Sequence, residues 1–358
     1  MTGSTARTAR VRRPARRTLA AALAVTAAGV LAACTSNSTD DGSSGEDTRR
    51  NAASSNDEPG EEVVIGFSGP EADHGWLAAI NSFAEETAAE YEDVELRVAE
   101  GTNDPSTQIS HIETFINDGV DAIVLLPTDG AALTQVATEA MEAGIPVVNV
   151  DREFSDEAAA RTTILGDNYG MGVAAGEYAC GLVQEHGLGG DAVIAEIAGL
   201  DSLPLTQDRS RGFADALEGC GQDVDNRVAA EFTVESGEAA ASNLLQARDS
   251  IDIVWNHDDD QGVGVMAAFE NAGRDEFFFI GGAGSANAMR WIQNGDMEAT
   301  VIYPATQAAD GIKLARLIAQ QRGLSDLVQV EVPRRIVLDA PVVTADNVEE
   351  YLPMGFES

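Results

Sequence analysis

Residues 121–152 read DAIVLLPTDGAALTQVATEAMEAGIPVVNVDR and contain one complete strand–helix–strand unit. An apolar run at 122–126 is followed by a turn at 127–129, a helix expected from about Ala131, and a second apolar run at 146–150. Continuous runs of Val, Ile and Leu are typical of strands buried on both faces of a parallel sheet. This stretch therefore predicts an α/β protein with a doubly wound parallel sheet.

The same alternation continues on both sides of this unit. Apolar runs at 63–67 and 94–98 come before it, and each precedes a segment with apolar residues spaced by three and four. Further strands are expected at 162–165, 192–197, 227–232, 252–255, 277–280 and 299–302, with helices between them. About ten strand–helix units exceed one comfortable sheet, so we expect two lobes.

The first 33 residues have the order of an export signal. Six arginines and no acidic residue precede an apolar run at 19–33, which is too short and too rich in alanine for a confident membrane span. The run ends Leu31-Ala32-Ala33-Cys34, which resembles the lipobox of bacterial lipoproteins. We expect a signal peptide at 1–33 and lipidation of Cys34; an ordinary signal peptide with an incidental cysteine is the alternative.

The segment that follows, and the charge of the whole chain, indicate a soluble body outside the cytoplasmic membrane. Residues 34–61 are nearly devoid of apolar side chains, which predicts a disordered tether. The chain has 22 basic and 60 acidic residues, a formal charge of −38. Such a charge disfavours nucleic acid and anionic lipid surfaces as partners. We therefore expect an extracytoplasmic protein, held to the membrane only through its lipid.

Two further cysteines, Cys180 and Cys220, lie in the body of the chain. In an oxidising compartment they can pair and tie one expected helix to the end of the next. Two buried free thiols are the alternative, and we expect the disulfide.

Polar and aromatic side chains follow several of the expected strands, where ligands bind in open parallel sheets. Pro127-Thr128-Asp129 follows one strand and Asp151-Arg152 the next. Sugars need such a combination, because buried hydroxyls require hydrogen-bonding partners and apolar ring faces require aromatic planes. The sequence therefore predicts a polar cleft with stacking surfaces.

Eight motifs follow one another along the chain: VVIGFSG, DHGWLAAI, DGVDAIVLLPTD, AGIPVVNVDRE, GDNYGMGVAAGEY, DRSRGFADAL, NHDDDQGVGVMAAF and GDMEATVIYP. With these motifs in this order, about residues 63–323 resemble the ribose- and galactose-type periplasmic binding proteins of ABC importers. The most specific is IPVVNVDRE followed closely by GDNYGMG. The resemblance implies two lobes joined by a three-strand hinge in a monomer. We expect the N-terminal lobe at 62–163 plus 304–333 and the C-terminal lobe at 164–303 plus 334–358.

The resemblance also implies which side chains hold the ligand. Asp151 and Arg152 would hydrogen-bond sugar hydroxyls, and Arg209 would do so from the other lobe. Trp76 and Phe232 match stacking positions. The full expected ligand set is Asp73, His74, Trp76, Asp151, Arg152, Arg209, Phe232, Asp258 and Tyr303. Core packing, a surface ion pair or a helix cap are the alternatives for its aromatic and charged members.

Three positions depart from the pattern of ribose binders. Leu126 replaces a polar residue, Ala283 replaces an expected aspartate, and Tyr303 stands where glutamine is usual. Fewer polar partners on the second lobe disfavour ribose itself. A different monosaccharide, a deoxy sugar or a polyol would fit as well.

The acidic triplet 258–260 could suggest a metal site. It stands where a helix begins, and acidic residues stabilise that end of a helix, so we expect no metal and no cofactor. The chain has no Gly-x-Ser-x-Gly motif and only 4 histidines, which argues against a secreted α/β enzyme. We expect a solute-binding lipoprotein that delivers a monosaccharide or sugar alcohol to an ABC importer permease. A sensory binding protein that reports to a membrane receptor is the alternative.

Overall fold

The computed structural model describes residue 56 and residues 58–322 and 332–357. The chain separates between Gly42 and Ser43 into two units, and every described residue belongs to the second unit. The expected signal peptide at 1–33, the lipidation site Cys34 and most of the expected tether lie outside the described residues. Within the part that is described, no helix is long and apolar enough to cross a membrane.

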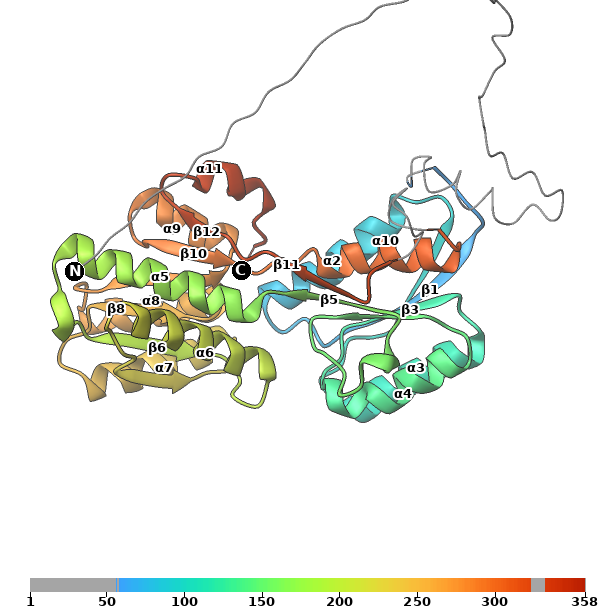
Figure 1. Ribbon diagram of the computed structural model, residues 1–358, viewed down its shortest axis with the longest axis horizontal. Coiled ribbons are helices and arrows are strands. Elements are labelled where there is room, and N and C mark those ends of the chain that lie inside the picture. The colour runs from blue at the N-terminus through green and yellow to red at the C-terminus, as the bar shows by residue number, and fades with distance from the viewer. Residues whose placement is uncertain (1–55, 57, 323–331, 358) are drawn as a thin grey trace, which may run out of the picture. The chain divides into compact units, whose positions relative to one another are not determined.

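The first sheet is entirely parallel and has six strands in the order β11-β5-β4-β3-β1-β2. The strands are β1 (Val63–Ser68), β2 (Val94–Val98), β3 (Ala122–Leu125), β4 (Val147–Val150), β5 (Thr162–Gly166) and β11 (Arg335–Leu338). Helices cover both of its faces (Figure 1). One face carries α2 (Gly75–Ala89) and α10 (Gln307–Ala319), and the other carries α3 (Pro105–Asp118) and α4 (Gly130–Glu142).

The apolar runs form these strands because both faces of each strand are buried. In β3, Val124 packs in the cluster that includes α2 and α10, whereas Ile123 and Leu125 pack in the cluster that includes α3 and α4. All three side chains are fully buried. Successive side chains of a strand point to opposite faces, so an uninterrupted apolar run is what a sheet covered on both faces requires.

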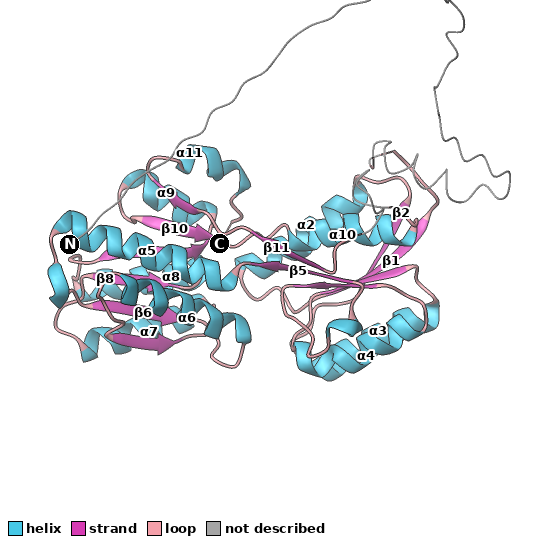
Figure 2. Ribbon diagram, in the orientation of Figure 1, coloured by secondary structure: helices cyan, strands magenta, loops and turns pink. Residues whose placement is uncertain are grey.

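The second sheet also has six strands, in the order β12-β10-β9-β8-β6-β7. Figure 2 labels three of them, β10, β8 and β6. All neighbours are parallel except β12, which runs antiparallel to β10. The strands are β6 (Ile194–Ala198), β7 (Asn226–Ala229), β8 (Ile253–Asn256), β9 (Phe278–Ala283), β10 (Ala299–Ile302) and β12 (Val342–Thr344). One face carries α5 (Asn168–His186) and α6 (Pro204–Gly219); the other carries α7 (Val234–Ala247), α8 (Asp259–Ala272) and α9 (Ala286–Asn294).

Four short helices complete the described secondary structure: η1 (Glu157–Ala159), η2 (Gly189–Asp191), α11 (Val348–Tyr351) and η3 (Leu352–Met354). The chain passes between the two sheets three times, from β5 to α5, from β10 to α10 and from β11 to β12. The predicted fold class, two parallel-sheet lobes joined by three crossing segments, is confirmed.

One expected lobe boundary differs from the sheet arrangement. We expected residues 334–358 in the second lobe, but β11 pairs with β5 in the first sheet, with Arg335 opposite Thr163 and Leu338 opposite Gly166. Sheet membership therefore changes between Leu338 and Val342. The physical reason is that β11 is an edge strand with exposed side chains, so it lacks the continuous apolar pattern of the central strands.

The residues that lead into β1 contact the body, although we expected a flexible tether up to residue 61. The guanidinium of Arg316 in α10 donates to the carbonyl oxygens of Asn56 and Glu58, at 2.6 and 2.8 Å. It also donates to both carboxylate oxygens of Asp93, at 2.8 and 2.7 Å. Burial raises the pKa of Asp93, but hydrogen bonds from Arg316 and Gln320 outweigh it and hold the pKa below its usual range. We call this group, with Asn56 and Glu58, the entry clamp.

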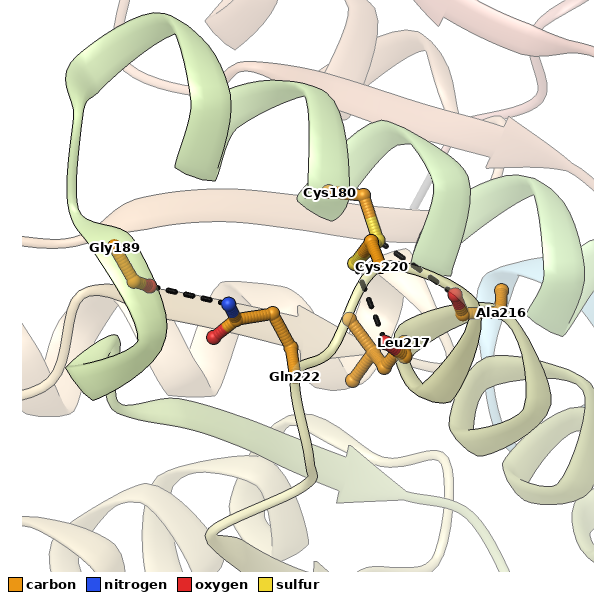
Figure 3. The surroundings of a disulfide bond; sticks show 6 residues. All are labelled: Cys180, Gly189, Ala216, Leu217, Cys220 and Gln222. Carbon is orange, nitrogen blue, oxygen red and sulfur yellow. Dashed lines mark hydrogen bonds between the residues drawn. A yellow bond between two sulfur atoms is a disulfide. The ribbon is translucent and has the colours of Figure 1, made fainter.

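Cys180 in α5 and Cys220, directly after α6, form a disulfide with an S–S distance of 2.00 Å (Figure 3). The predicted pairing is therefore present in the structure. The two sulfur atoms lie against carbonyl oxygens of the last turn of α6, and Gln222 donates to the carbonyl oxygen of Gly189 at 3.1 Å. The bond joins two neighbouring helices on one face of the second sheet.

Candidate ligand cleft

A cavity of about 380 Å³, counted to its mouth, lies where the two lobes meet. Its lining residues are His74, Trp76, Asp151, Arg152, Leu203, Leu205, Arg209, Phe232, Asp258, Ala283 and Tyr303. Eight of the nine residues that we expected to hold a ligand are in this set. They come from sites up to 230 residues apart in the chain, so the fold gathers them.

The first lobe contributes Asp151 and Arg152, directly after β4. Arg152 Nη1 donates to the carbonyl oxygens of Thr128 and Pro127, at 2.8 and 3.3 Å. Its Nε is buried and has no partner among the described residues, and it lies 3.8 Å from Oδ2 of Asp151. The guanidinium is thus held in place on one side and keeps a donor for a further acceptor.

The second lobe contributes Arg209 from α6, which is 4% exposed. Its Nε donates to the side-chain oxygen of Asn168 at 2.9 Å, and its Nη1 donates to the carbonyl oxygen of His257 at 3.1 Å. Helices α5 and α6 approach closely at Gly172, where an added Cβ would lie 2.0 Å from the carbonyl oxygen of Arg209. The position of Arg209 therefore depends on this glycine contact.

Tyr303 follows β10 and lies between these charged groups. The guanidinium carbon of Arg209 is 4.4 Å from its ring centre, an arrangement that is attractive through the ring quadrupole. Its hydroxyl donates to Asp151 and accepts from Asn168 at 3.1 Å. Burial, and then the charge of Asp151, raise the pKa of Tyr303, so the phenol stays protonated and can donate. The prediction placed Tyr303 in the cleft, and the contacts show that it also links Asp151 to Arg209.

Trp76 belongs both to the hydrophobic core and to the wall of the cavity. It is 6% exposed and packs with the core, and it also lines the cavity. Its Nε1 donates to the carbonyl oxygen of Tyr303 at 3.1 Å, and the two rings lie 5.5 Å apart between centres at 41°.

His74 and Phe232 stack across the cavity, with ring centres 6.3 Å apart and an angle of 27° between planes. We expected a strand at 227–232 that ends at Phe232. In the structure β7 ends at Ala229, so Phe232 lies in the loop that follows the strand. Asp73, the ninth expected residue, does not line the cavity. Its side chain is 42% exposed and bonds to Nδ1 of His74 at 2.6 Å and to Asn103 at 3.1 Å, so it orients the imidazole from outside.

Three residues of the cavity wall have left-handed backbone conformations. Asp151, Phe232 and Ala283 have φ angles of 64°, 65° and 93°. Such angles are uncommon for residues other than glycine and persist where the surroundings enforce them. Here the N–H of Asp151 donates to Ile164 at 2.9 Å, and the N–H of Phe232 donates to the side chain of Gln261 at 3.1 Å. This clustering of strained residues is typical of functional sites.

Two residues of the acidic triplet, Asp258 and Asp259, have different roles within the second lobe. Asp258 lines the cavity and caps α8 by accepting from the N–H of Gln261 at 3.1 Å. Burial, and then the charge of Asp260, raise its pKa well above the usual range. Asp259 accepts from Gly282, Gly284 and Ser285 and so fixes the turn after β9, and burial raises its pKa to about 7. Throughout the described ranges, no group of three or more acidic, histidine or cysteine residues is placed to hold a metal ion.

Sequence reasoning missed three residues of this region. Leu203 and Leu205, around the start of α6, give the second lobe an apolar wall, and Asn168 connects Arg209 to Tyr303. Asn168 lies in the GDNYGMG motif, which was recognised without a role for this residue. Leu126, noted as a departure, is fully buried in the core and does not line the cavity.

Comparison with known proteins agrees with this geometry. Residues 65–323 match the family model described as periplasmic binding protein domain. The ribose import binding protein RbsB of Bacillus subtilis is 32% identical over 222 residues, which cover 60% of this chain and 70% of that protein. An ABC transporter solute-binding protein of Bacillus halodurans, solved with bound myo-inositol, has a TM-score of 0.71 at 25% identity over 82% of this chain and 98% of that one. A solute-binding protein of Mycobacterium smegmatis with bound glycerol has a TM-score of 0.72 at 25% identity, over 83% and 99% of the two chains.

These matches confirm that the chain is a binding protein and not an enzyme, as the sequence predicted. The family model covers most of the chain and includes strands of both sheets, although β11 and β12 lie beyond the matched residues. The chain belongs to the periplasmic binding proteins of type I, in the ribose- and galactose-type group of solute-binding proteins of ABC importers.

Proposed function

We propose that the cleft captures a monosaccharide or a sugar alcohol and that the closed protein delivers it to an ABC importer permease. The observation that supports this most directly is the convergence of Arg152 and Asp151 from one lobe with Arg209 and Asp258 from the other, beside the rings of Trp76 and further aromatic residues. Hydroxyl groups need such donors and acceptors, because an unpaired buried hydroxyl costs about 1–3 kcal/mol. The rings supply the apolar planes on which sugar carbons pack.

The side chains of the cavity wall restrict which sugars or polyols can fit. On the second lobe, Leu203, Leu205 and Ala283 offer no hydrogen-bonding side chain. A ligand that presents an apolar or lightly hydroxylated edge to this wall therefore fits better than ribose, which supports a deoxy sugar. A polyol stays within the proposed class on other grounds, because one relative was solved with bound myo-inositol and another with bound glycerol.

The location of the protein is part of the proposal. The arginine-rich segment, the apolar run and Cys34 support an extracytoplasmic lipoprotein that reaches the membrane through its lipid and a short tether. Lobe closure around the ligand then presents one conformation to the permease. A sensory protein that reports to a membrane receptor has the same cleft, and the partner that recognises the closed form distinguishes the two roles.

Thermal melting of residues 43–358, the unit that holds all the described residues, tests the ligand class. The panel contains pentoses, hexoses, deoxy sugars, polyols, amino acids and nucleosides. A ligand that binds only the folded form stabilises it by about 2.7 kcal/mol at one hundred times its dissociation constant. We expect a shift with a sugar or polyol that Arg152→Ala abolishes.

Arg290→Ala is the matched control, because Arg290 pairs with Glu357 at an exposed site, with side-chain exposures of 49% and 72%. It should leave the ligand-induced shift unchanged. Shifts with amino acids or nucleosides alone would contradict the sugar assignment and leave the family assignment intact.

A further inference from the structure

Helix α2 begins at the mouth of the cleft without a cap from its own lobe. Its N-cap residue, His74, makes no side-chain hydrogen bond to the first turn in the described structure, and that turn has no acidic residue. The neighbouring helices α3 and α4 are capped locally by Asp104 and Asp129. The first N–H groups of a helix have no partner within the helix and need an acceptor from elsewhere.

The acceptor for α2 is Asp260, which belongs to α8 on the second lobe. Its Oδ2 accepts a hydrogen bond from the backbone N–H of Trp76 at 3.2 Å. Asp260 is 4% exposed. Two groups from separate lobes, 184 positions apart in sequence, thus complete one helix cap.

The negative charge of Asp260 lies close to the N-terminal ends of two helices, α8 and α2. It occupies the first turn of α8 and lies at the first turn of α2. Each helix N-terminus carries roughly half a positive charge, so two such ends repel when they approach. A carboxylate between them offsets this repulsion. Its neighbours Asp258 and Asp259 bond instead to backbone groups of their own lobe.

We propose that Asp260 is a closure residue, which caps α2 only when the two lobes meet. It adds to ligand affinity without lining the cavity, because the closed form gains the hydrogen bond from the N–H of Trp76, which an open form lacks. The cap also positions Trp76, whose indole lines the cavity and donates to Tyr303. This inference rests on the proposed ligand-binding function for its effect on affinity, but the cap itself does not depend on which ligand binds.

The test compares Asp260→Ala and Asp260→Asn with the wild type in residues 43–358. Spin labels at Glu113→Cys and Glu238→Cys, exposed positions on α3 and α7, report the distance between lobes, with and without ligand. The probes are myo-inositol, D-ribose and glycerol, and calorimetry gives their dissociation constants. Glu270→Ala is the matched control, an exposed acidic residue on the same helix, α8.

We expect Asp260→Ala to weaken binding by about two- to thirtyfold, the range that corresponds to loss of a helix cap, and to lower the closed fraction. Asp260→Asn keeps an acceptor oxygen but loses the charge, so its effect should be intermediate. Glu270→Ala should match the wild type.

Identical distance distributions and affinities for Asp260→Ala and the wild type would overturn the proposal. If no probe binds any variant, the sugar assignment fails, and the ligand-free distances still decide the role of Asp260. If Asp260→Ala does not fold, Asp260→Asn provides the same comparison: a lower closed fraction supports the proposal, and an unchanged one overturns it.

Discussion

Removal of the charge at Arg316 should destabilise the protein strongly. The side chains of Arg316 and Asp93 are 2% and 5% exposed, and the guanidinium also stacks 4.3 Å from the ring centre of Tyr91. Arg316→Met keeps much of the apolar volume but leaves the carboxylate of Asp93 buried without its cation. Breaking a buried ion pair in this way costs about 3–5 kcal/mol. With an unfolding entropy of about 2.1 cal/mol/K per residue over about 290 residues, that corresponds to a fall in Tm of about 5–8 °C.

Urea unfolding, followed by circular dichroism, measures this loss. Arg290→Met, in the exposed pair with Glu357, is the control and should leave the free energy of unfolding nearly unchanged. Asp93→Asn in the Arg316→Met background should recover part of the loss, because no unpaired charge is then buried.

The pH dependence provides a second arm of this experiment. The pKa of Asp93 is held below its ordinary value, so its stabilisation is present above about pH 4 and is lost as the pH falls further. The difference between the wild type and Arg316→Met should therefore shrink in acid. A cost below about 1 kcal/mol at neutral pH, or a difference that grows in acid, would refute the reasoning.

Two further perturbations test the packing of α5 against α6. Replacing Cys180 and Cys220 together by alanine should lower the free energy of unfolding by about 2–4 kcal/mol, because the bond closes a loop of 40 residues; an unchanged urea midpoint would contradict this. Gly172→Ala should cost about 1–3 kcal/mol and weaken ligand binding, since its Cβ would collide with the backbone of Arg209. Gly181→Ala, on the same helix with nothing within 4 Å of the added Cβ, should instead stabilise by about 0.5–1 kcal/mol, and equal effects of the two glycine variants in thermal melts would be evidence against a close helix contact.

The central strands could be predicted because burial on both faces leaves a clear mark on the sequence. Ala122–Leu125 and Val147–Val150 are fully buried; the first is an unbroken apolar run, and the second is apolar except for Asn149. The edge strands Arg335–Leu338 and Val342–Thr344 were not predicted, since half of such a strand faces solvent and the pattern is too short to stand out.

Some residues of the candidate site could also be predicted from the sequence, and others could not. Side chains at strand ends, such as Asp151 and Arg152, could be predicted because ligands gather at the carboxyl edge of parallel sheets. The cap that Asp260 provides for α2 could not, because periodicity within a segment carries no information on which distant segment it meets. The left-handed backbone at Phe232 and Ala283 likewise follows from contacts made in the folded protein, not from residue type.

The entry clamp fixes the start of the described chain to the first lobe. Chain that precedes Asn56 joins the body through Arg316 on α10, so any pull from that side is transmitted to the first sheet. For a chain anchored through Cys34, as proposed above, the first lobe is then the one tied to the membrane, and the second lobe is joined to it through three connections.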